Sequence, residues 1–373
     1  MIILSPGPVT TSDATKAAMR RDFSPNEPDL LALTASLRRR LVAIANGGEG
    51  YTCVMLQGAG NTANEAVLGT LVPRERKVLV VVNGHYGQRL LDIARAIGVP
   101  CAALEVPITE PVAPEQVEAA LAADARVSHL AVCHVDTGTG LRNPIEALAA
   151  VARQRGVGLL VDAIASFGGL PIDAPALGAE AIVLSPNKWL EGVPGMALTL
   201  VRRSTLEAAA GRCHSFCLDL HRQWQSHETY GGWRFTPPAQ AIAALDVALR
   251  RHAEEGREAR LARVGANWRT LVDGMRALGF ATVLRDEVAA PVIATFHAPA
   301  DEHFDRERLF ALMRERGFVL FRGSLTPFPA LRIGCMGAFD QATMREVVRA
   351  VEACLAAMGV TDCHPAVRPE AAE

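Results

Sequence analysis

Lysine is scarce in this chain of 373 residues. Only three lysines occur among its 38 basic residues, at Lys16, Lys77 and Lys188. Lys188 follows the apolar run 181–184, an unusual place for a solvated charge. Unlike a guanidinium group, an ammonium group in apolar surroundings can lose its proton and attack a carbonyl. Lys188 is therefore a candidate Schiff-base lysine, and a strand-end lysine that extends its ammonium group into water is an equal alternative.

The chain also lacks an excess of charge and a long apolar run. Its formal net charge is −2, which does not favour a nucleic-acid or other polyanionic partner. No run approaches the roughly 18 apolar residues of a membrane span. Residues 1–12 lack the charged and apolar regions of a signal peptide. We therefore expect a cytoplasmic protein without a nucleic-acid or membrane partner.

Aromatic residues make up only 5% of the chain, although half of all residues are hydrophobic. Alanine, leucine and valine must therefore fill a large core, and the length suggests more than one domain. The eight cysteines are scattered, as expected for reduced thiols. One group of residues could share a helical face, but its spacing matches no common zinc pattern, so we favour an ordinary polar helix and predict no metal site. That group is Cys213, Cys217, His221 and His227.

Short strands rich in valine and leucine alternate with helices through the first 200 residues. Continuous apolar strands of this kind are typical of a mostly parallel sheet that is covered on both faces. The sequence therefore predicts an α/β fold, in which ligands bind at the carboxyl ends of the strands. We expect strands at residues 51–57, 77–82, 128–135, 156–162, 181–184 and 196–201.

The pattern changes after Pro237, where two long amphipathic helices are followed by alternating strands and helices. This part of the chain predicts a smaller α+β layer, with strands at 281–286, 290–298, 318–321 and 330–334. We expect an N-terminal arm with a large domain over 1–250, a small domain over 251–362 and a disordered tail over 363–373.

Polar residues that suit a cofactor follow several of the predicted strands. The turn GAGN (58–61) opens a helix and offers backbone N–H groups to a phosphate, although many tight turns contain two glycines. Tyr86 could stack on a flat ring, although a half-buried tyrosine is commoner. Asp162 ends an apolar strand, where its carboxylate needs a partner: an arginine, or the protonated nitrogen of a pyridine ring.

Asp162 and Lys188 are separated by 26 residues, a spacing that fits strand–helix–strand. This spacing would place both side chains at the same edge of the sheet. Together with the glycine turn and Tyr86 they form the set of groups that pyridoxal 5'-phosphate (PLP) needs. Arg332 also ends a predicted strand and could bind an acid group through both guanidinium nitrogens, or form an ordinary surface pair.

Longer motifs follow one another in the order of a known family. The chain resembles the class V (fold-type I) aminotransferases from about residue 4 to residue 358. The fold-type I likeness implies a seven-stranded, mostly parallel sheet. The motifs are SPGP (5–8), QGAGNTANEAVLG (57–69), VVNGHYGQR (81–89), VDAIASFGGLPID (161–173), SPNKWLEGVPG (185–195), WRFTPP (233–238) and LRIGCMG (331–337).

The resemblance implies roles for individual residues. Lys188 would hold PLP covalently and Asp162 would bind its pyridine nitrogen. Arg332 and Gly7 would contact the substrate. Thr236 would reach the phosphate of a neighbouring subunit, which implies a homodimer with active sites at the interface. The remaining cofactor contacts would come from Ala59, Gly60, Asn61, Tyr86 and Asn187.

Within the family, the resemblance is nearest to the branch that moves an amino group from 2-aminoethylphosphonate to pyruvate. The alanine/serine–glyoxylate transaminases come next, and a PLP lyase on the same scaffold is a further alternative. A cysteine desulfurase would need a reactive thiol, for which only Cys335 is an obvious candidate. A non-enzymatic sensor would need a DNA-binding segment that the sequence lacks.

Three positions depart from the phosphonate branch, and so does the stretch DFSPNEPD (22–29), where that branch has an acidic segment that contains tryptophan. Ala59 stands where that branch has serine, which removes a hydroxyl from the phosphate site. In HVDTGTG (134–140), Asp136 replaces a glutamate and Gly138 replaces a threonine whose hydroxyl would lie near the ring. The departures leave PLP chemistry in place and bear on the choice of substrate.

Overall fold

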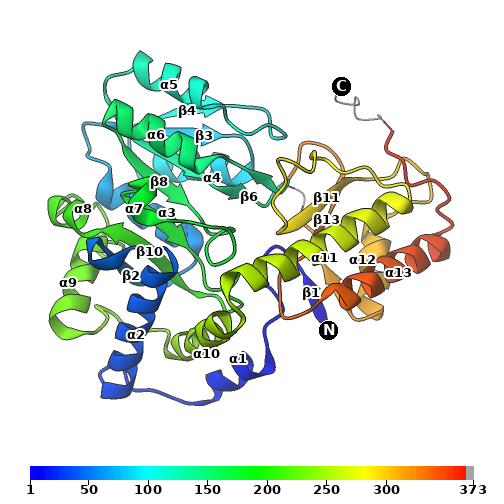
Figure 1. The fold of residues 1–373 in the computed structure, drawn as a ribbon, viewed down its shortest axis with the longest axis horizontal. Coiled ribbons are helices and arrows are strands. Elements are labelled where there is room, and N and C mark those ends of the chain that lie inside the picture. The colour runs from blue at the N-terminus through cyan, green and yellow to red at the C-terminus, as the bar shows by residue number, and fades with distance from the viewer. Residues whose placement is uncertain (324, 367–373) are drawn as a thin grey trace.

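The computed structural model describes residues 1–323 and 325–366 and has two lobes (Figure 1). The large lobe contains a seven-stranded sheet in which only β10 runs antiparallel to its neighbours β2 and β9. The predicted fold class, α/β with a mostly parallel seven-stranded sheet, is confirmed. The strand order is β2 (Tyr51–Gly58), β10 (Gly195–Arg202), β9 (Ala181–Leu184), β8 (Gly158–Asp162), β5 (Val127–Cys133), β3 (Lys77–Val82) and β4 (Cys101–Glu105).

Helices cover both faces of this sheet, because successive strand residues point to opposite faces. Val80 packs into the core on one face, and Val81 packs into the core on the other. The first core includes α3 (Gly60–Leu71) and α4 (His85–Ala96). The second includes α2 (Pro28–Ile44), α5 (Pro114–Ala123), α6 (Ile145–Arg155) and α10 (Ala239–Glu255). Continuous apolar strands are therefore stable only between these layers.

The small lobe is an α+β layer with a core of its own. β11 (Ile293–His297) pairs antiparallel with β13 (Ala330–Gly334), and β12 (Phe318–Leu320) pairs parallel with β1 (Ile2–Leu4). The start of the chain thus lies in this lobe. Three helices complete it: α11 (Arg257–Ala277), α12 (Arg306–Glu315) and α13 (Gln341–Met358).

Three predictions for the C-terminal part have different outcomes. The strand expected at 281–286 is wrong, because only an isolated bridge between Thr282 and Phe296 forms there. The disordered tail expected at 363–373 lies mostly outside the described residues. The domain boundary at 250/251 stays a prediction; α10 and α11 meet at Gly256, whose φ is +80°.

A short hairpin, β6 (Val135–Asp136) and β7 (Leu141–Arg142), connects the two lobes. The N–H of Arg142 donates to the carbonyl of Val288 at 3.0 Å, and the N–H of Ala290 donates to the carbonyl of Gly140 at 2.8 Å. These bonds fix residues 137–140 between the sheet and the small lobe.

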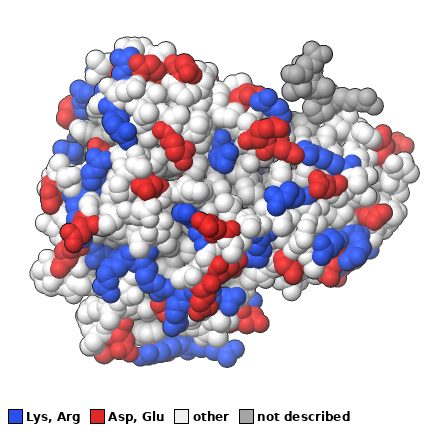
Figure 2. All heavy atoms as spheres, in the orientation of Figure 1, with Lys and Arg blue, Asp and Glu red and all other residues white. Residues whose placement is uncertain are grey.

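The surface carries charges of both signs. Figure 2 shows acidic and basic side chains interspersed over one face of the molecule. None of the helices in the described ranges is long and apolar enough to cross a lipid bilayer.

Candidate active site

Lys188 is buried in the loop that follows β9, with only 7% of the residue exposed. Burial lowers the pKa of its ammonium group to about 8, against the opposing effect of the Asp162 carboxylate. Gly7 lies against the lysine stem: a Cβ atom at Gly7 would be 2.5 Å from Cε of Lys188. The alternative in which this lysine extends into water is therefore wrong.

Asp162 ends β8, the strand beside β9, so both side chains leave the sheet at the same edge. The carboxylate accepts hydrogen bonds from Nδ2 of Asn64 at 2.8 Å and from the N–H of Ile164 at 3.0 Å. Burial raises the pKa of Asp162. No arginine of the described residues pairs with it, so the carboxylate remains available to a cationic ligand.

The GAGN turn forms the N-terminus of α3. Ala59 is the N-cap residue, and its methyl side chain cannot accept the hydrogen bond that serine or threonine would accept. The first-turn N–H groups of a helix have no intrahelical partner and favour an anion. Gly60 lets the turn approach Ile164, since a Cβ atom at Gly60 would lie 2.3 Å from Cδ1 of Ile164. Ala59 is exposed and Asn61 is partly buried, so this end of the helix is accessible.

Asp136 fixes the segment that carries Tyr86. Its carboxylate accepts hydrogen bonds from the N–H of Tyr86 at 2.7 Å and from the N–H of Gly138 at 2.6 Å. A Cβ atom at Gly138 would lie 2.7 Å from the nearer carboxylate oxygen. The folded-back carboxylate therefore occupies the space that a side chain at Gly138 would need.

Arg332 lies on β13 of the small lobe and is only 3% exposed. Its guanidinium group donates to the carbonyls of Thr137 at 2.8 Å and Gly323 at 2.6 Å, and it lies 4.5 Å from the ring centre of Phe321. Within the described ranges, no carboxylate forms an ion pair with it. A buried cation held only by neutral groups favours binding of an acidic ligand.

The cofactor contacts expected of Asn187 and Thr236 stay predictions. Asn187 is partly buried in the Lys188 loop, where the Ser185 hydroxyl donates to its Oδ1. The side chain of Thr236 is exposed, and its carbonyl accepts from Nε2 of Gln57 at the end of β2. One chain thus gathers Lys188, Asp162 and Gly7 at the sheet edge but leaves Thr236 on the surface.

Sequence reasoning missed two arginines of α11 that hold the lysine loop. Nη1 of Arg260 donates to the carbonyl of Trp189 at 2.6 Å. Nη2 of Arg263 pairs with the carboxylate of Glu191 at 2.8 Å, and its Nε pairs with Glu255 at 2.7 Å. These bonds connect the small lobe to the loop of Lys188. No local pattern marks them, since the chain is rich in arginine.

Replacing Arg263 with methionine is expected to destabilise the fold by about 2–3 kcal/mol, because Glu191 would be left buried without its partner. Urea unfolding measures this loss. The change should also loosen the loop of Lys188, since that loop loses a fixed point. The matched control is Arg269→Met, an exposed arginine on the same helix. Equal stability of the two variants would remove Arg263 from this positioning role.

Comparison with known proteins identifies the family. A family model described as "Aminotransferase class-V" matches residues 15–346. The chain belongs to this family. A Burkholderia pseudomallei protein named 2-aminoethylphosphonate–pyruvate transaminase is 47% identical over 360 residues, which cover 96% of this chain and 98% of that protein.

Solved structures of other aminotransferases share the fold. The pyridoxamine–pyruvate aminotransferase of Mesorhizobium loti is 26% identical, with a TM-score of 0.88 and coverage of 96% of this chain and 93% of the other. An alanine–glyoxylate aminotransferase from Nostoc is also 26% identical, with a TM-score of 0.88 and coverage of 95% of each chain. This class-V aminotransferase is therefore an enzyme that depends on PLP and acts on small amine and keto-acid substrates.

Proposed function

We propose that this aminotransferase moves the amino group of 2-aminoethylphosphonate to pyruvate and releases phosphonoacetaldehyde and alanine. The near full-length match at 47% identity to a transaminase named for these substrates is the observation that carries the proposal. The buried amine of Lys188 and the buried carboxylate of Asp162 support it chemically. So does the guanidinium group of Arg332, which has no carboxylate partner in the described part of the chain.

The residues present fit PLP at three points. Lys188 would hold the aldehyde carbon, Asp162 would bind the ring nitrogen, and the uncapped start of α3 would receive the phosphate. In this arrangement Tyr86 would lie against the ring and Asn187 beside it. When bound, PLP supplies an electron sink for the substrate carbon that loses a proton.

The environment of Lys188 suits proton transfer. Because burial lowers the pKa of its ammonium group to about 8, a useful fraction is uncharged near neutral pH. Nζ would then take a proton from the substrate carbon as a general base and give it, as a general acid, to the cofactor carbon that had carried the aldehyde oxygen. Asp162 keeps a proton at the ring nitrogen, and its hydrogen bonds to Asn64 and Ile164 fix the carboxylate there. Gly7 covers the lysine stem and excludes water from it.

The same proposal includes a cytoplasmic homodimer in which Thr236 completes the phosphate site of the partner subunit. Phe216 is 67% exposed and Tyr230 is 78% exposed, both in the segment that leads to Thr236. Large apolar side chains gathered at one exposed segment favour a protein interface. Sedimentation of the holoenzyme tests the dimer, and a monomer at assay concentrations would contradict it.

A matrix of amino donors and keto acids tests the substrates. We expect the highest kcat/KM with 2-aminoethylphosphonate and pyruvate, and little turnover without a keto acid. A preference for alanine or serine with glyoxylate would replace the proposal by the alternative transaminase. Release of ammonia or phosphorus without an acceptor would indicate a lyase. The desulfurase alternative is disfavoured, because Cys335 is fully buried and burial raises the pKa of its thiol.

Replacing Arg332 with alanine is expected to raise the KM of the acidic substrate by roughly 30-fold or more, because a bidentate ion pair would be lost. The effect on kcat should be smaller. Arg332→Lys keeps the positive charge but cannot form two parallel hydrogen bonds to one acid group. Its KM should therefore lie between those of the unaltered enzyme and Arg332→Ala. Unchanged saturation by both substrates would leave Arg332 with a structural role only.

A further inference from the structure

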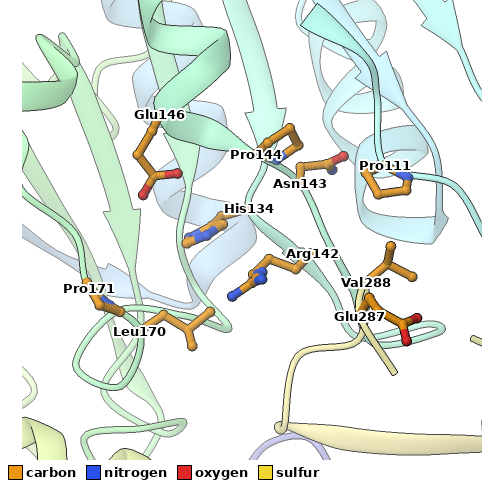
Figure 3. A pocket seen from close by; sticks show the side chains of 10 residues that line it. All are labelled: Pro111, His134, Arg142, Asn143, Pro144, Glu146, Leu170, Pro171, Glu287 and Val288. Atoms are coloured by element: carbon orange, nitrogen blue, oxygen red, sulfur yellow. The ribbon is translucent and has the colours of Figure 1, made fainter. Parts of the chain in front are cut away.

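A cavity separate from the candidate active-site residues lies between the large lobe and residues 287–288. It has a volume of about 410 Å³ (Figure 3). Its walls carry His134, Arg142 and Glu146 from the large lobe, with Leu170 and Pro171 as an apolar side. The backbone of His134 is directly linked to the active site, since its N–H donates to the carbonyl of Asp162 at 2.9 Å.

His134 is the observation that points to a ligand. The residue is only 3% exposed, and its ring projects among the lining side chains of the cavity. Within residues 1–323 and 325–366, its Nδ1 atom is buried and has no hydrogen-bond partner. An unpaired buried polar atom costs free energy. Burial lowers the pKa of this imidazole to about 3, so the ring is neutral and can both donate and accept.

Three exposed charged residues of both signs line the cavity: Arg142, Glu146 and Glu287. Arg142 lies on one side of the ring and Glu146 on the other, and both line the same cavity (Figure 3). Neither forms an ion pair with the other or with another described residue. A small molecule with one anionic and one cationic group would satisfy both at once, with its apolar part against Leu170 and Pro171.

We propose that this cavity binds a small zwitterionic α-amino acid. Its carboxylate would pair with Arg142, its ammonium group would pair with Glu146, and His134 would complete the hydrogen bonds. The choice of L-alanine as the probe rests on the proposed function, in which alanine is the product. The ligand would contact residues of both lobes, because Glu287 and Val288 also line the cavity, and it would therefore stabilise their arrangement.

Equilibrium binding of labelled L-alanine tests the proposal. The holoenzyme is first treated with borohydride, which locks the cofactor onto Lys188 so that alanine cannot react there. We expect saturable binding that weakens about tenfold in Arg142→Ala and in Glu146→Gln, since each removes one charge-assisted contact. Acetate and ethylamine, which carry one charge each, should bind at least about tenfold more weakly than alanine.

Matched controls are Arg349→Ala and Glu352→Gln, two exposed residues of α13 that do not line the cavity. They should bind alanine as the unaltered protein does. Equal alanine binding in all four variants, or no binding at all, would show that the proposed site does not exist. Acetate binding as tight as alanine binding would show that the site does not require a zwitterion. Turnover is measured separately on untreated protein, where Arg142→Ala should be unchanged. The two assays are therefore independent. A lack of turnover with the phosphonate would not change the alanine-binding result, and a lack of alanine binding would not change the turnover result.

Discussion

Replacing Lys188 with alanine is expected to lower transamination by roughly 10⁴-fold or more, because one amine both holds the cofactor and transfers the proton. The variant should keep its fold, since the change removes a buried cation that has no ion-pair partner among the described residues. Steady-state turnover measures the loss. Mass spectrometry after borohydride treatment should find no cofactor attached to the protein.

The other two lysines serve as controls for this experiment. Lys16 and Lys77 form ion pairs with Asp13 and Asp124, and neither contacts the candidate site. Lys16→Ala and Lys77→Ala should therefore retain turnover and cofactor attachment. Retention of both by Lys188→Ala would show that another group performs the chemistry.

The buried setting of Lys188 also predicts a pH dependence. In cofactor-free protein, burial lowers the pKa of the ammonium group to about 8. Reductive methylation of Lys188, followed by peptide mass analysis, should therefore reach half of its maximum near pH 8 and level off above it. A midpoint near the ordinary lysine pKa of about 10.4 would contradict the buried placement.

Replacing Asp162 with asparagine is expected to lower turnover by roughly 10²–10⁴-fold, because the ring nitrogen would lose its anionic partner. Asparagine has nearly the same shape as aspartate, so the change removes the charge and little volume. Steady-state kinetics with cofactor in excess measures this effect separately from weaker cofactor binding. The outcome that would remove Asp162 from its proposed role is full turnover under these conditions.

The Asp162→Asn variant should also change the pKa of Lys188 in a defined direction. The Asp162 carboxylate raises the pKa of the lysine and so opposes the effect of burial. In Asp162→Asn, the methylation midpoint should therefore move below pH 8. Asp173→Asn is the matched control, since this aspartate caps α7 (Ala174–Leu177) on the surface. It should leave both the midpoint and turnover unchanged.

Much of the sheet could be predicted because its strands are short, apolar and bounded by turns. The expected strands at 77–82, 181–184 and 330–334 coincide with β3, β9 and β13. β4 carries no such signal, because it is an edge strand with several partly exposed residues. The false strand at 281–286 shows the limit of the method: an apolar stretch forms a strand only where a neighbouring strand offers its hydrogen bonds.

Side-chain partners are harder to predict, since they depend on segments far apart in the chain. Asn64 bonds to Asp162 across 98 residues, and Arg263 pairs with Glu191 across 72. The exchange at Asp136 and Gly138 could be read as two separate departures from the family. The structure shows that the Asp136 carboxylate, folded onto the backbone, occupies the space beside Gly138.

The sequence by itself determined the layered α/β fold and the residues at the strand ends, because hydrophobic periodicity and turn chemistry are local properties. Its motifs indicated the family through their resemblance to known aminotransferases. Only the tertiary structure decided that Lys188 is buried, that Arg332 has no carboxylate partner among the described residues, and that His134 borders a cavity. Burial and pairing arise when strands, helices and lobes pack together. The reactivity of a lysine is set by that packing, since removal from water is what lowers its pKa.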